Sequence, residues 1–278
     1  MNVVFYDAYN LIYRAKHALP HHMQKSSFGI LFAFFRSFAA VNRKLQPDLA
    51  YFVTEGTPVE RLQLLPEYKG NRVYEKDDNF ISQRRKIIEI MASDMPVVVA
   101  NHLNHECDDI LAHLVKKHAK LGDDVTVVST DTDFLQLANT VDGYKQYDPI
   151  RKAYKILPEH DYISWKALVG DSSDNISGFK GIGNKRALGF LDDTKKLNDF
   201  LLLDNNSEKF LLNKKLISFI DVTNTEHMIT LSKCSPNWDT LFKTFSDMNL
   251  KSIISNKGWT NFIDAFGGCC GANENSRH

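Results

Sequence analysis

The chain has 278 residues, of which 43% are hydrophobic, and its 34 basic side chains balance its 34 acidic ones. This size supports a buried core in one large domain or two small ones. A zero net charge neither indicates nor excludes nucleic-acid binding, which depends on where the charges lie. Here the basic residues cluster at 69–72, 84–86 and 180–186.

The sequence lacks the features of membrane, secreted and zinc-binding proteins. No apolar run approaches the ~18 residues of a membrane span, and the first residues show no signal-peptide pattern. The four cysteines (Cys107, Cys234, Cys269 and Cys270) lack the spacing of a zinc site and favour a reducing compartment over a disulfide framework. These features predict a soluble, cytoplasmic protein.

Strands and helices are predicted to alternate through residues 1–160. Short apolar runs at 3–6, 49–53, 97–100 and 125–128 predict buried parallel strands. Helical spacing predicts helices at 28–45 and 109–121, and two further short strands are expected within 144–155. This alternation is typical of an α/β fold, with a mainly parallel sheet and helices on both faces.

The pattern changes at about Asp161. Strand-like runs stop, glycines recur between 178 and 183, and helical stretches continue to about Phe266. We therefore expect a second, helical module over residues 161–265. The small and polar residues of 266–278 predict a flexible tail.

Acidic residues follow three of the predicted strands. In a parallel sheet they would share the rim at the carboxyl ends of the strands, where open α/β sheets bind ligands. Cations relieve the repulsion between such groups, and all-oxygen ligands suit Mg²⁺ or Mn²⁺ rather than zinc. Two such ions about 3.5–4 Å apart can activate water and stabilise the leaving oxygen in phosphodiester hydrolysis. The six residues are Asp7, Glu106, Asp108, Asp109, Asp131 and Asp133.

Each of these residues alone has a simpler explanation. An aspartate after a strand is often a helix N-cap, and an acid in the first helical turn interacts favourably with the helix dipole. Acidic groups at three strand ends together are poorly explained in this way, so a metal site is the favoured interpretation.

Five segments, in this order, carry a family resemblance: YDAYNLIYRA at 6–15, LLPEYKGNR at 64–72, HECDD at 105–109, STDTDFLQL at 129–137 and GDSSDNISGFKGIGNKRA at 170–187. Over residues 2–190 the chain resembles the 5′-nuclease superfamily of flap endonucleases, phage 5′ exonucleases and the 5′-nuclease domain of bacterial DNA polymerase I. The resemblance implies a PIN-like fold and a stand-alone, monomeric enzyme of the bacterial cytosol or a phage-infected cell.

The resemblance also implies a role for single residues. Lys69, together with Arg72, is implied as the catalytic contact to the scissile phosphate, and Tyr68 as a platform for a base. Without the motif, a solvated surface run would be the preferred interpretation of Lys69 and Arg72. Two adjacent sites for Mg²⁺ or Mn²⁺ are implied at Asp7, Glu106, Asp108, Asp109, Asp131, Asp133, Asp171 and Asp174.

One segment departs from the family pattern. The family usually has an aspartate after the strand at 49–53, where this sequence reads FVTEG. Counting back from LPEYKGNR places Thr54 at that position, whereas counting forward from Pro47 places Glu55 there. Either the aspartate is lost, or Glu55 replaces it as a metal ligand.

The segment at 178–187 predicts a contact with the DNA backbone. Gly181 and Gly183 let backbone N–H groups approach a phosphate, with a helix start behind them. The segment resembles the family's helix–hairpin–helix (helix–three-turn–helix) motif, which grips duplex DNA and often holds K⁺ through carbonyls; a helix-capping turn is the alternative. Salt-sensitive attraction to phosphate is expected from Lys180, Lys185 and Arg186.

Residues 72–95 are polar and then helical from about Phe80. The resemblance implies a helical arch through which a single strand passes, and a plain surface helix explains its three basic residues equally well. The residues implied to line the arch are Arg84, Arg85 and Lys86.

Together these patterns predict a metal-dependent 5′ nuclease for DNA with a 5′ flap or a free 5′ end, acting in replication or repair. An RNA–DNA hybrid is a further candidate substrate. One alternative is a PIN-type ribonuclease, which shares the acidic rim but not the hairpin and arch. The other is a catalytically weak DNA-structure-binding protein, which the FVTEG departure leaves open.

Overall fold

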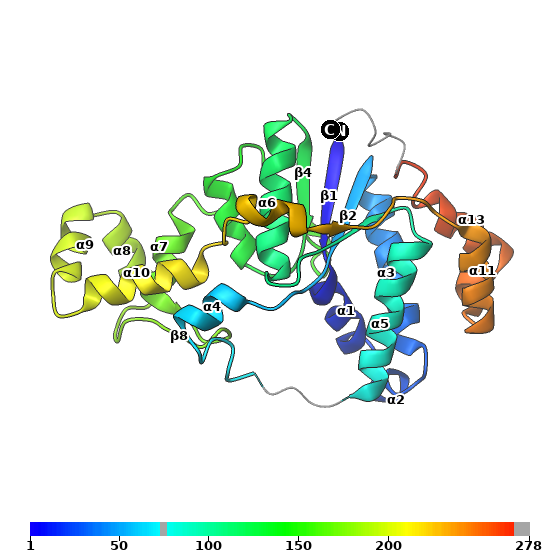
Figure 1. The fold of residues 1–278 in the computed structure, drawn as a ribbon, viewed down its shortest axis with the longest axis horizontal. Helices are drawn as coiled ribbons and strands as arrows, with labels where there is room; N and C mark the ends of the chain where they lie inside the picture. The colour runs from blue at the N-terminus through cyan, green and yellow to red at the C-terminus, as the bar shows by residue number, and fades with distance from the viewer. Residues whose placement is uncertain (73–76, 270–278) are drawn as a thin grey trace.

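The computed structural model describes residues 1–72 and 77–269. Within these residues a seven-stranded sheet has the order β6–β5–β4–β1–β2–β3–β9 (Figure 1). Strands β1 to β5 run parallel, while β6 and β9 pair antiparallel at the two edges, so the predicted mainly parallel sheet is confirmed. The strands are β1 (Asn2–Asp7), β2 (Leu49–Val53), β3 (Val98–Asn101), β4 (Asp124–Val128), β5 (Lys145–Asp148), β6 (Ala153–Tyr154) and β9 (Thr230–Leu231).

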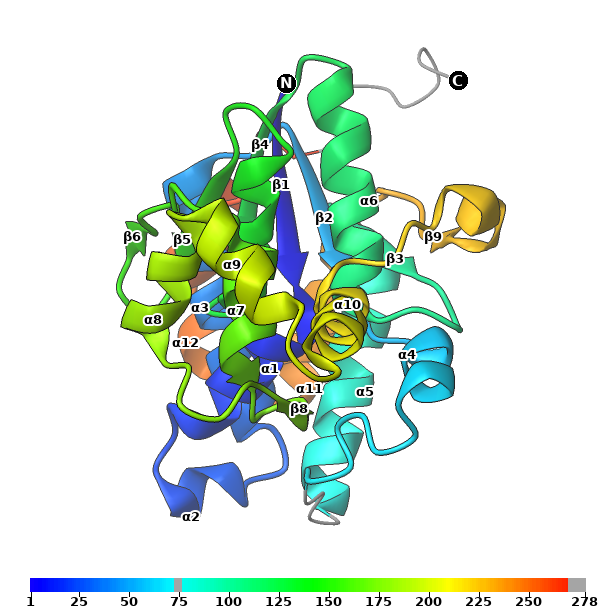
Figure 2. The same cartoon turned by 90° about the vertical axis from the view of Figure 1, so that its left-hand side faces the viewer.

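Helices cover both faces of this sheet, because the central strands are apolar on both faces. In β1, Val4 and Tyr6 pack into one core and Val3 and Phe5 into the other, following the two-residue repeat of a strand. The first core lies against α1 (Ala8–His17), α3 (Gly29–Leu45) and α5 (Asp78–Ser93). The second lies against α6 (Cys107–Lys120), on the opposite side of the sheet (Figure 2).

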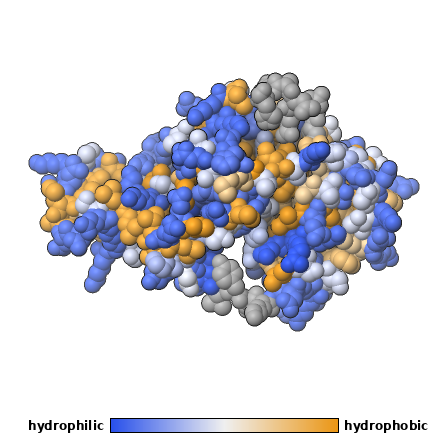
Figure 3. All heavy atoms as spheres, in the orientation of Figure 1, coloured by the Kyte–Doolittle hydropathy of each residue, from blue (hydrophilic) through white to orange (hydrophobic). Residues whose placement is uncertain are grey.

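A helical part projects from one end of the molecule (Figure 1). It has its own core, in which Leu168, Phe190 and Phe210 take part. Hydrophobic residues are also exposed at that end (Figure 3), among them Leu202 at 82% exposure. The elements are α7 (Tyr162–Val169), β7 (Gly170–Asp171), β8 (Ile176–Ser177), α8 (Asn184–Leu191), α9 (Thr194–Leu201) and α10 (Asn206–Ile217).

Residues 161–265 do not share one core. The last helices, α11 (Trp238–Asp247), α12 (Lys251–Ile254) and α13 (Asn256–Asp264), lie at the opposite end of the molecule (Figure 1) and pack against α3. Phe245 on α11 lies 4.9 Å from the ring of Phe35 on α3. Three short strands, β7, β8 and β9, also occur after Asp161, where no strand was expected. Each has only two residues, so none forms an apolar run that the sequence could show.

The region expected as a tail begins with packed residues. Phe266 is 2% exposed and stacks on Phe38 at 5.7 Å, whereas residues 270–278 lie outside the described part of the chain. Among the described cysteines, Cys107 and Cys269 are free thiols.

The remaining short elements connect the layers. They are α2 (His21–Gln24), α4 (Val59–Leu64) and the 3₁₀ helices η1 (Asp133–Asn139) and η2 (Thr223–Met228). Across the described residues, no helix combines the length and the apolar character needed to cross a membrane.

Candidate active site

Asp7 anchors the site at the junction of β1 and α1. It ends the strand and caps the helix, accepting a hydrogen bond from Asn10 N at 3.1 Å. Its other oxygen accepts from the hydroxyl of Ser129, 2.8 Å away, directly after β4. The start of α6 lies close by, with the Cys107 thiol 3.9 Å from Asp7 Oδ1. The carboxyl edge of the sheet therefore does bring the predicted segments together.

Four acidic residues at this edge form what we call the first carboxylate group: Asp7, Glu55, Asp108 and Asp131. Burial raises the pKa of Asp7 to about 6, helped by the charge of Asp131. Burial also raises the pKa of Asp108 well above its usual range, and Asp131, Asp7 and Glu55 add to the shift. These carboxylates repel one another in a partly desolvated site, and a bound cation would stabilise their ionised form.

Glu55, and not Thr54, faces the first carboxylate group. The Thr54 hydroxyl donates to Ala100 O at 3.2 Å and accepts from Asn101 Nδ2 at 3.0 Å, so both of its hydrogen bonds are made to residues at the end of β3. Burial, opposed by the charge of Lys69 and helped by the charges of Glu106 and Asp7, raises the pKa of Glu55 to about 7. The Thr54 hydroxyl is therefore already hydrogen-bonded, and Glu55 stays the predicted replacement for the missing aspartate.

Three aspartates form the second carboxylate group: Asp133, Asp171 and Asp174. One oxygen from each lies within 4.8 Å of the others. Asp133 begins η1, and the short β7–β8 hairpin carries the other two. A cavity of about 250 Å³ is lined by members of both groups, together with Lys69 and Arg72.

Lys166 on α7 is a site residue that the sequence analysis missed. Its ammonium pairs with Asp133 and lies 2.6 Å from Asp171 Oδ2. The side chain is only 10% exposed. A lysine in the apolar stretch ISWKALV, five residues before Asp171, was the available signal.

Asp109 does not join either group, which corrects the predicted set of metal ligands. It is fully buried, and Arg61 binds both of its oxygens, at 2.7 and 2.8 Å. Arg61 also donates to Glu106 Oε2 at 2.8 Å and to the backbone carbonyls of Leu216 and Ser218. Arg61 was not predicted as a site residue, because nothing in its segment distinguishes it from a surface arginine.

Lys69, Arg72 and Tyr68 lie at the rim of the second group. Lys69 pairs with Glu106, and Arg72 Nη2 lies 2.5 Å from Asp174 Oδ1. Tyr68 is 5% exposed, and its hydroxyl donates to Asp174 at 2.9 Å and lies 3.1 Å from Glu106 Oε2. Tyr68 therefore has no open ring face in this structure, unlike the base-stacking platform that the resemblance implied.

The predicted DNA-binding hairpin is on the surface of the projecting part. Gly181 has φ +77°, a conformation that favours glycine, and Gly183 is the N-cap of α8. A Cβ on Gly183 would meet open space. The basic residues of the segment, Lys180, Lys185 and Arg186, are all exposed.

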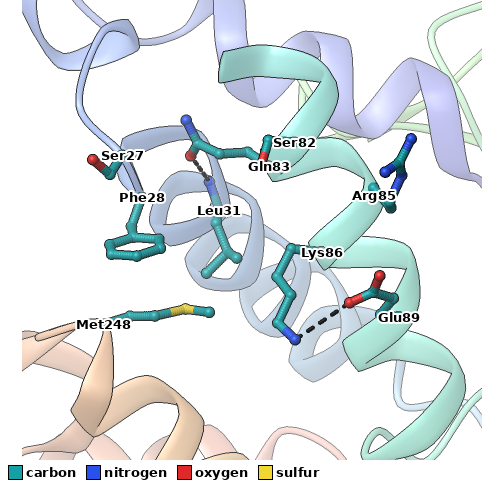
Figure 4. Close-up of a pocket in the computed structure, with 9 residues that line it drawn as sticks. All are labelled: Ser27, Phe28, Leu31, Ser82, Gln83, Arg85, Lys86, Glu89 and Met248. Atoms are coloured by element: carbon teal, nitrogen blue, oxygen red, sulfur yellow. Dashed lines mark hydrogen bonds and ion pairs between the residues drawn. The ribbon is translucent and has the colours of Figure 1, made fainter. Parts of the chain in front are cut away.

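The basic residues expected in the arch point in different directions. Arg84 lies 5.0 Å from the ring of Tyr9 on α1, the helix that Asp7 caps. Arg85 and Lys86 instead line a separate cavity of about 290 Å³ near Phe28, where Lys86 reaches toward Glu89 (Figure 4). Of the predicted arch, residues 73–76 lie outside the described residues.

Known proteins resemble this chain in sequence. The family model described as "5′-3′ exonuclease, N-terminal resolvase-like domain" matches residues 2–162. The flap endonuclease of Escherichia phage T5 is 29% identical over 72% of this chain and 72% of its own. DNA polymerase I of Caldicellulosiruptor bescii is 25% identical over 95% of this chain, which spans 34% of that protein. The chain thus covers about a third or less of the polymerase relatives.

Solved structures share the fold. The T5 D15 protein co-crystallised with metal ions has a TM-score of 0.63 and 24% identity, over 95% of this chain and 99% of that one. Human GEN1 in complex with Holliday junction DNA has a TM-score of 0.57 and 14% identity, over 95% and 72% of the two chains. The predicted resemblance and the PIN-like fold class are therefore confirmed, and the chain belongs to the 5′-3′ exonuclease family.

Proposed function

We propose that this chain is a metal-dependent 5′ nuclease that hydrolyses DNA phosphodiesters at free 5′ ends and 5′ flaps. One observation carries the proposal: carboxylates from both groups and three cationic side chains, Lys69, Arg72 and Lys166, line a single cavity at the carboxyl edge of the sheet. Membership of the 5′-3′ exonuclease family supports the same reaction class. We further propose that it works in DNA replication or repair, in a bacterial cytosol or a phage-infected cell, because its relatives include a bacterial DNA polymerase I and a phage flap endonuclease.

The residues present fit a pair of divalent ions. Both groups offer only carboxylate oxygens, and those of the second group lie within 4.8 Å of one another. Oxygen donors of this kind match Mg²⁺ or Mn²⁺. The first group would hold one ion and the second group the other. When bound, such ions supply an activated water and stabilise the leaving oxygen. Glu106 instead holds Lys69 in place.

Lys69 and Arg72 bind and orient the scissile phosphate in this proposal. Burial lowers the pKa of Lys69, but the carboxylates of Glu106 and Asp174 outweigh burial and raise it above its usual range. Lys69 therefore carries its proton at neutral pH. A fixed cation in a partly dry cavity stabilises the charge that develops on a phosphate during hydrolysis.

The hairpin at 178–183 and the start of α8 form the proposed grip on duplex DNA. Exposed backbone at Gly181 and Gly183 allows close approach to a phosphate, and the first N–H groups of α8 attract negative charge. The carbonyl groups of the same turn are also the proposed binding site for K⁺. Helix α7, the turn at 178–183 and α8 together form the proposed helix–hairpin–helix motif. Replacement of K⁺ by Na⁺ at constant ionic strength should weaken duplex binding without changing flap cleavage at saturating DNA.

Arg84 is the arch residue best placed to meet a single strand on its way to the cavity, because it packs on Tyr9, two residues after Asp7. A monomer is sufficient for this arrangement, since both carboxylate groups come from one chain. An RNA–DNA hybrid would meet the same phosphate contacts, so we include it among the substrates to be tried.

The decisive experiment compares cleavage of a 5′-labelled DNA flap, a blunt duplex, an RNA–DNA hybrid and a matched RNA flap. We expect the DNA flap to be cut with Mg²⁺ or Mn²⁺ and to stay intact with EDTA. Preference for the RNA flap would indicate a PIN-type ribonuclease instead. Tight binding of the DNA flap with no cleavage in either metal would indicate a DNA-structure-binding protein.

A further inference from the structure

The two carboxylate groups differ in how much positive charge the protein itself places on them. Across residues 1–72 and 77–269, no ion pair of 4.0 Å or less joins a basic side chain to the first carboxylate group. Every member of the second carboxylate group has such a partner: Lys166 pairs with Asp133 and Asp171, and Arg72 with Asp174.

Lys166 is held firmly in its position. Its side chain is 10% exposed and rises from α7, whose first turn is capped by Asp161 through the N–H groups of Ile163 and Ser164. The ammonium lies 6.0 Å from the ring of Tyr162. Lys166 thus reaches the aspartates from a fixed helix, rather than as a mobile surface chain.

An ion bound by the second group needs the oxygens that Lys166 uses. Asp171 Oδ2 lies 2.6 Å from the Lys166 ammonium, and Asp171 Oδ1 accepts from Ser173 N and Ser173 Oγ, at 2.9 and 2.6 Å. Both oxygens of Asp171 are therefore engaged. A divalent cation and an ammonium a few ångströms apart repel each other strongly in a partly dry cavity.

We propose that Lys166 is a positioning residue that acts as a built-in counter-ion of the second carboxylate group and weakens its affinity for a divalent ion. Lys166 keeps Asp133 and Asp171 close together, and an entering ion has to displace it. The displaced ammonium then faces the cavity beside Lys69 and Arg72, where a DNA phosphate lies in the proposed function. The inference rests on that function for the location of the ion.

The test is a titration of the full chain with Mn²⁺ in the absence of DNA. Electron paramagnetic resonance measures the free Mn²⁺ at each point and so gives the binding isotherm. We expect a tight and a weak class of site in the wild type. K166M removes the charge at nearly constant side-chain length, so it should tighten the weak class at least tenfold. K166R keeps the charge and should leave it unchanged. The matched control is K214M, because Lys214 on α10 also pairs with an aspartate, Asp161, 3.9 Å away and outside both groups.

A merely structural role for Lys166 predicts the opposite sign. If Lys166 only holds α7 and the aspartates in place, K166M would weaken Mn²⁺ binding or leave it unaltered, and the counter-ion proposal would be overturned. If K166M does not fold by near-UV circular dichroism, K166Q must show the same tightening. Failure of the nuclease function is separable: the wild type would then leave the DNA flap uncut, while the Mn²⁺ isotherms still report on Lys166.

Discussion

Asp108 and Asp109 are neighbours on α6, yet they meet opposite environments. Successive residues of an α-helix point about 100° apart. Asp108 therefore lines the cavity of both carboxylate groups, whereas Asp109 turns away to Arg61. One side chain has its charge opposed by other carboxylates, and the other has its charge satisfied by a guanidinium.

This contrast predicts a separation of function from stability. D108N should abolish flap cleavage and leave the free energy of unfolding in EDTA unchanged or slightly increased, because like-charge repulsion falls. D109N should keep a measurable part of the activity but lose about 3–5 kcal/mol of stability, because Arg61 stays buried with half of its charge partner removed. Urea unfolding and flap cleavage measured on both variants check the pair. Equal loss of stability in the two would contradict the assignment.

Glu55 permits a second test at single-residue scale. If Glu55 replaces the family's aspartate, E55Q should raise the Mg²⁺ concentration needed for half-maximal cleavage without abolishing activity at saturating Mg²⁺. Its longer side chain favours binding through a water molecule, which Mg²⁺ tolerates well. E60Q is the matched control, because Glu60 is exposed on α4. A Mg²⁺ titration that is the same for wild type, E55Q and E60Q would show that Glu55 is not a ligand.

At the scale of elements, the hairpin and the start of α8 form the proposed duplex grip. K185A combined with R186A should weaken duplex binding uniformly across sequences and reduce the slope of log K against log salt by about 1 for each phosphate that the protein no longer neutralises. The control is K251A with K257A, which removes two exposed cations from α12 and α13 at the other end of the molecule. A salt slope that is unchanged in K185A/R186A would place the grip elsewhere.

Elements whose signal is local were predictable, and those that depend on distant contacts were not. The central strands could be located within a residue or two, because apolar runs such as VVFY and VTVV are their own evidence. The strand β9 pairs with β3 through only two residues, and no short stretch of sequence around it has the pattern of a strand. The same limit applies to the site: carboxylates after strands are visible in sequence, whereas Arg61 and Lys166 become site residues only through packing of α4 and α7.

The division of the chain depends on contacts of this long-range kind. Helices α11 to α13 follow the projecting part in sequence but return to α3, where Phe35 and Phe38 extend the aromatic cluster of the first core. Periodicity shows that these segments are helices and not which surface they cover. For this reason the predicted boundary at about residue 160 marks where the chain becomes mainly helical, but it does not divide the chain into two hydrophobic cores.

At the scale of the whole molecule, the raised pKa values of carboxylates in both groups predict an unusual pH dependence of stability. Native pKa values near 6 for Asp7 and Asp133 and near 7 for Glu55 exceed their ordinary values of 3.8 and 4.5. Between about pH 4 and pH 7 the native state therefore binds more protons than the unfolded state, so stability falls as pH rises. In EDTA the chain should become more stable as the pH is lowered from 7.5 to 5.5.

Magnesium should reverse this slope. Bound ions require ionised carboxylates, so protons compete with the ions and stability in saturating Mg²⁺ should fall as the pH is lowered. Thermal melts at pH 7.5 and 5.5, in EDTA and in Mg²⁺, give the four values needed, and each 1 kcal/mol corresponds to about 2–4 °C in a chain of this size.

The buried His102 acts in the opposite direction in EDTA, because burial lowers its pKa. Measuring D108N beside the wild type cancels the histidine contribution, since His102 is retained in both. If the melting temperatures show the same pH slope with and without Mg²⁺, in wild type and D108N alike, the acidic cavity is not where the ions bind.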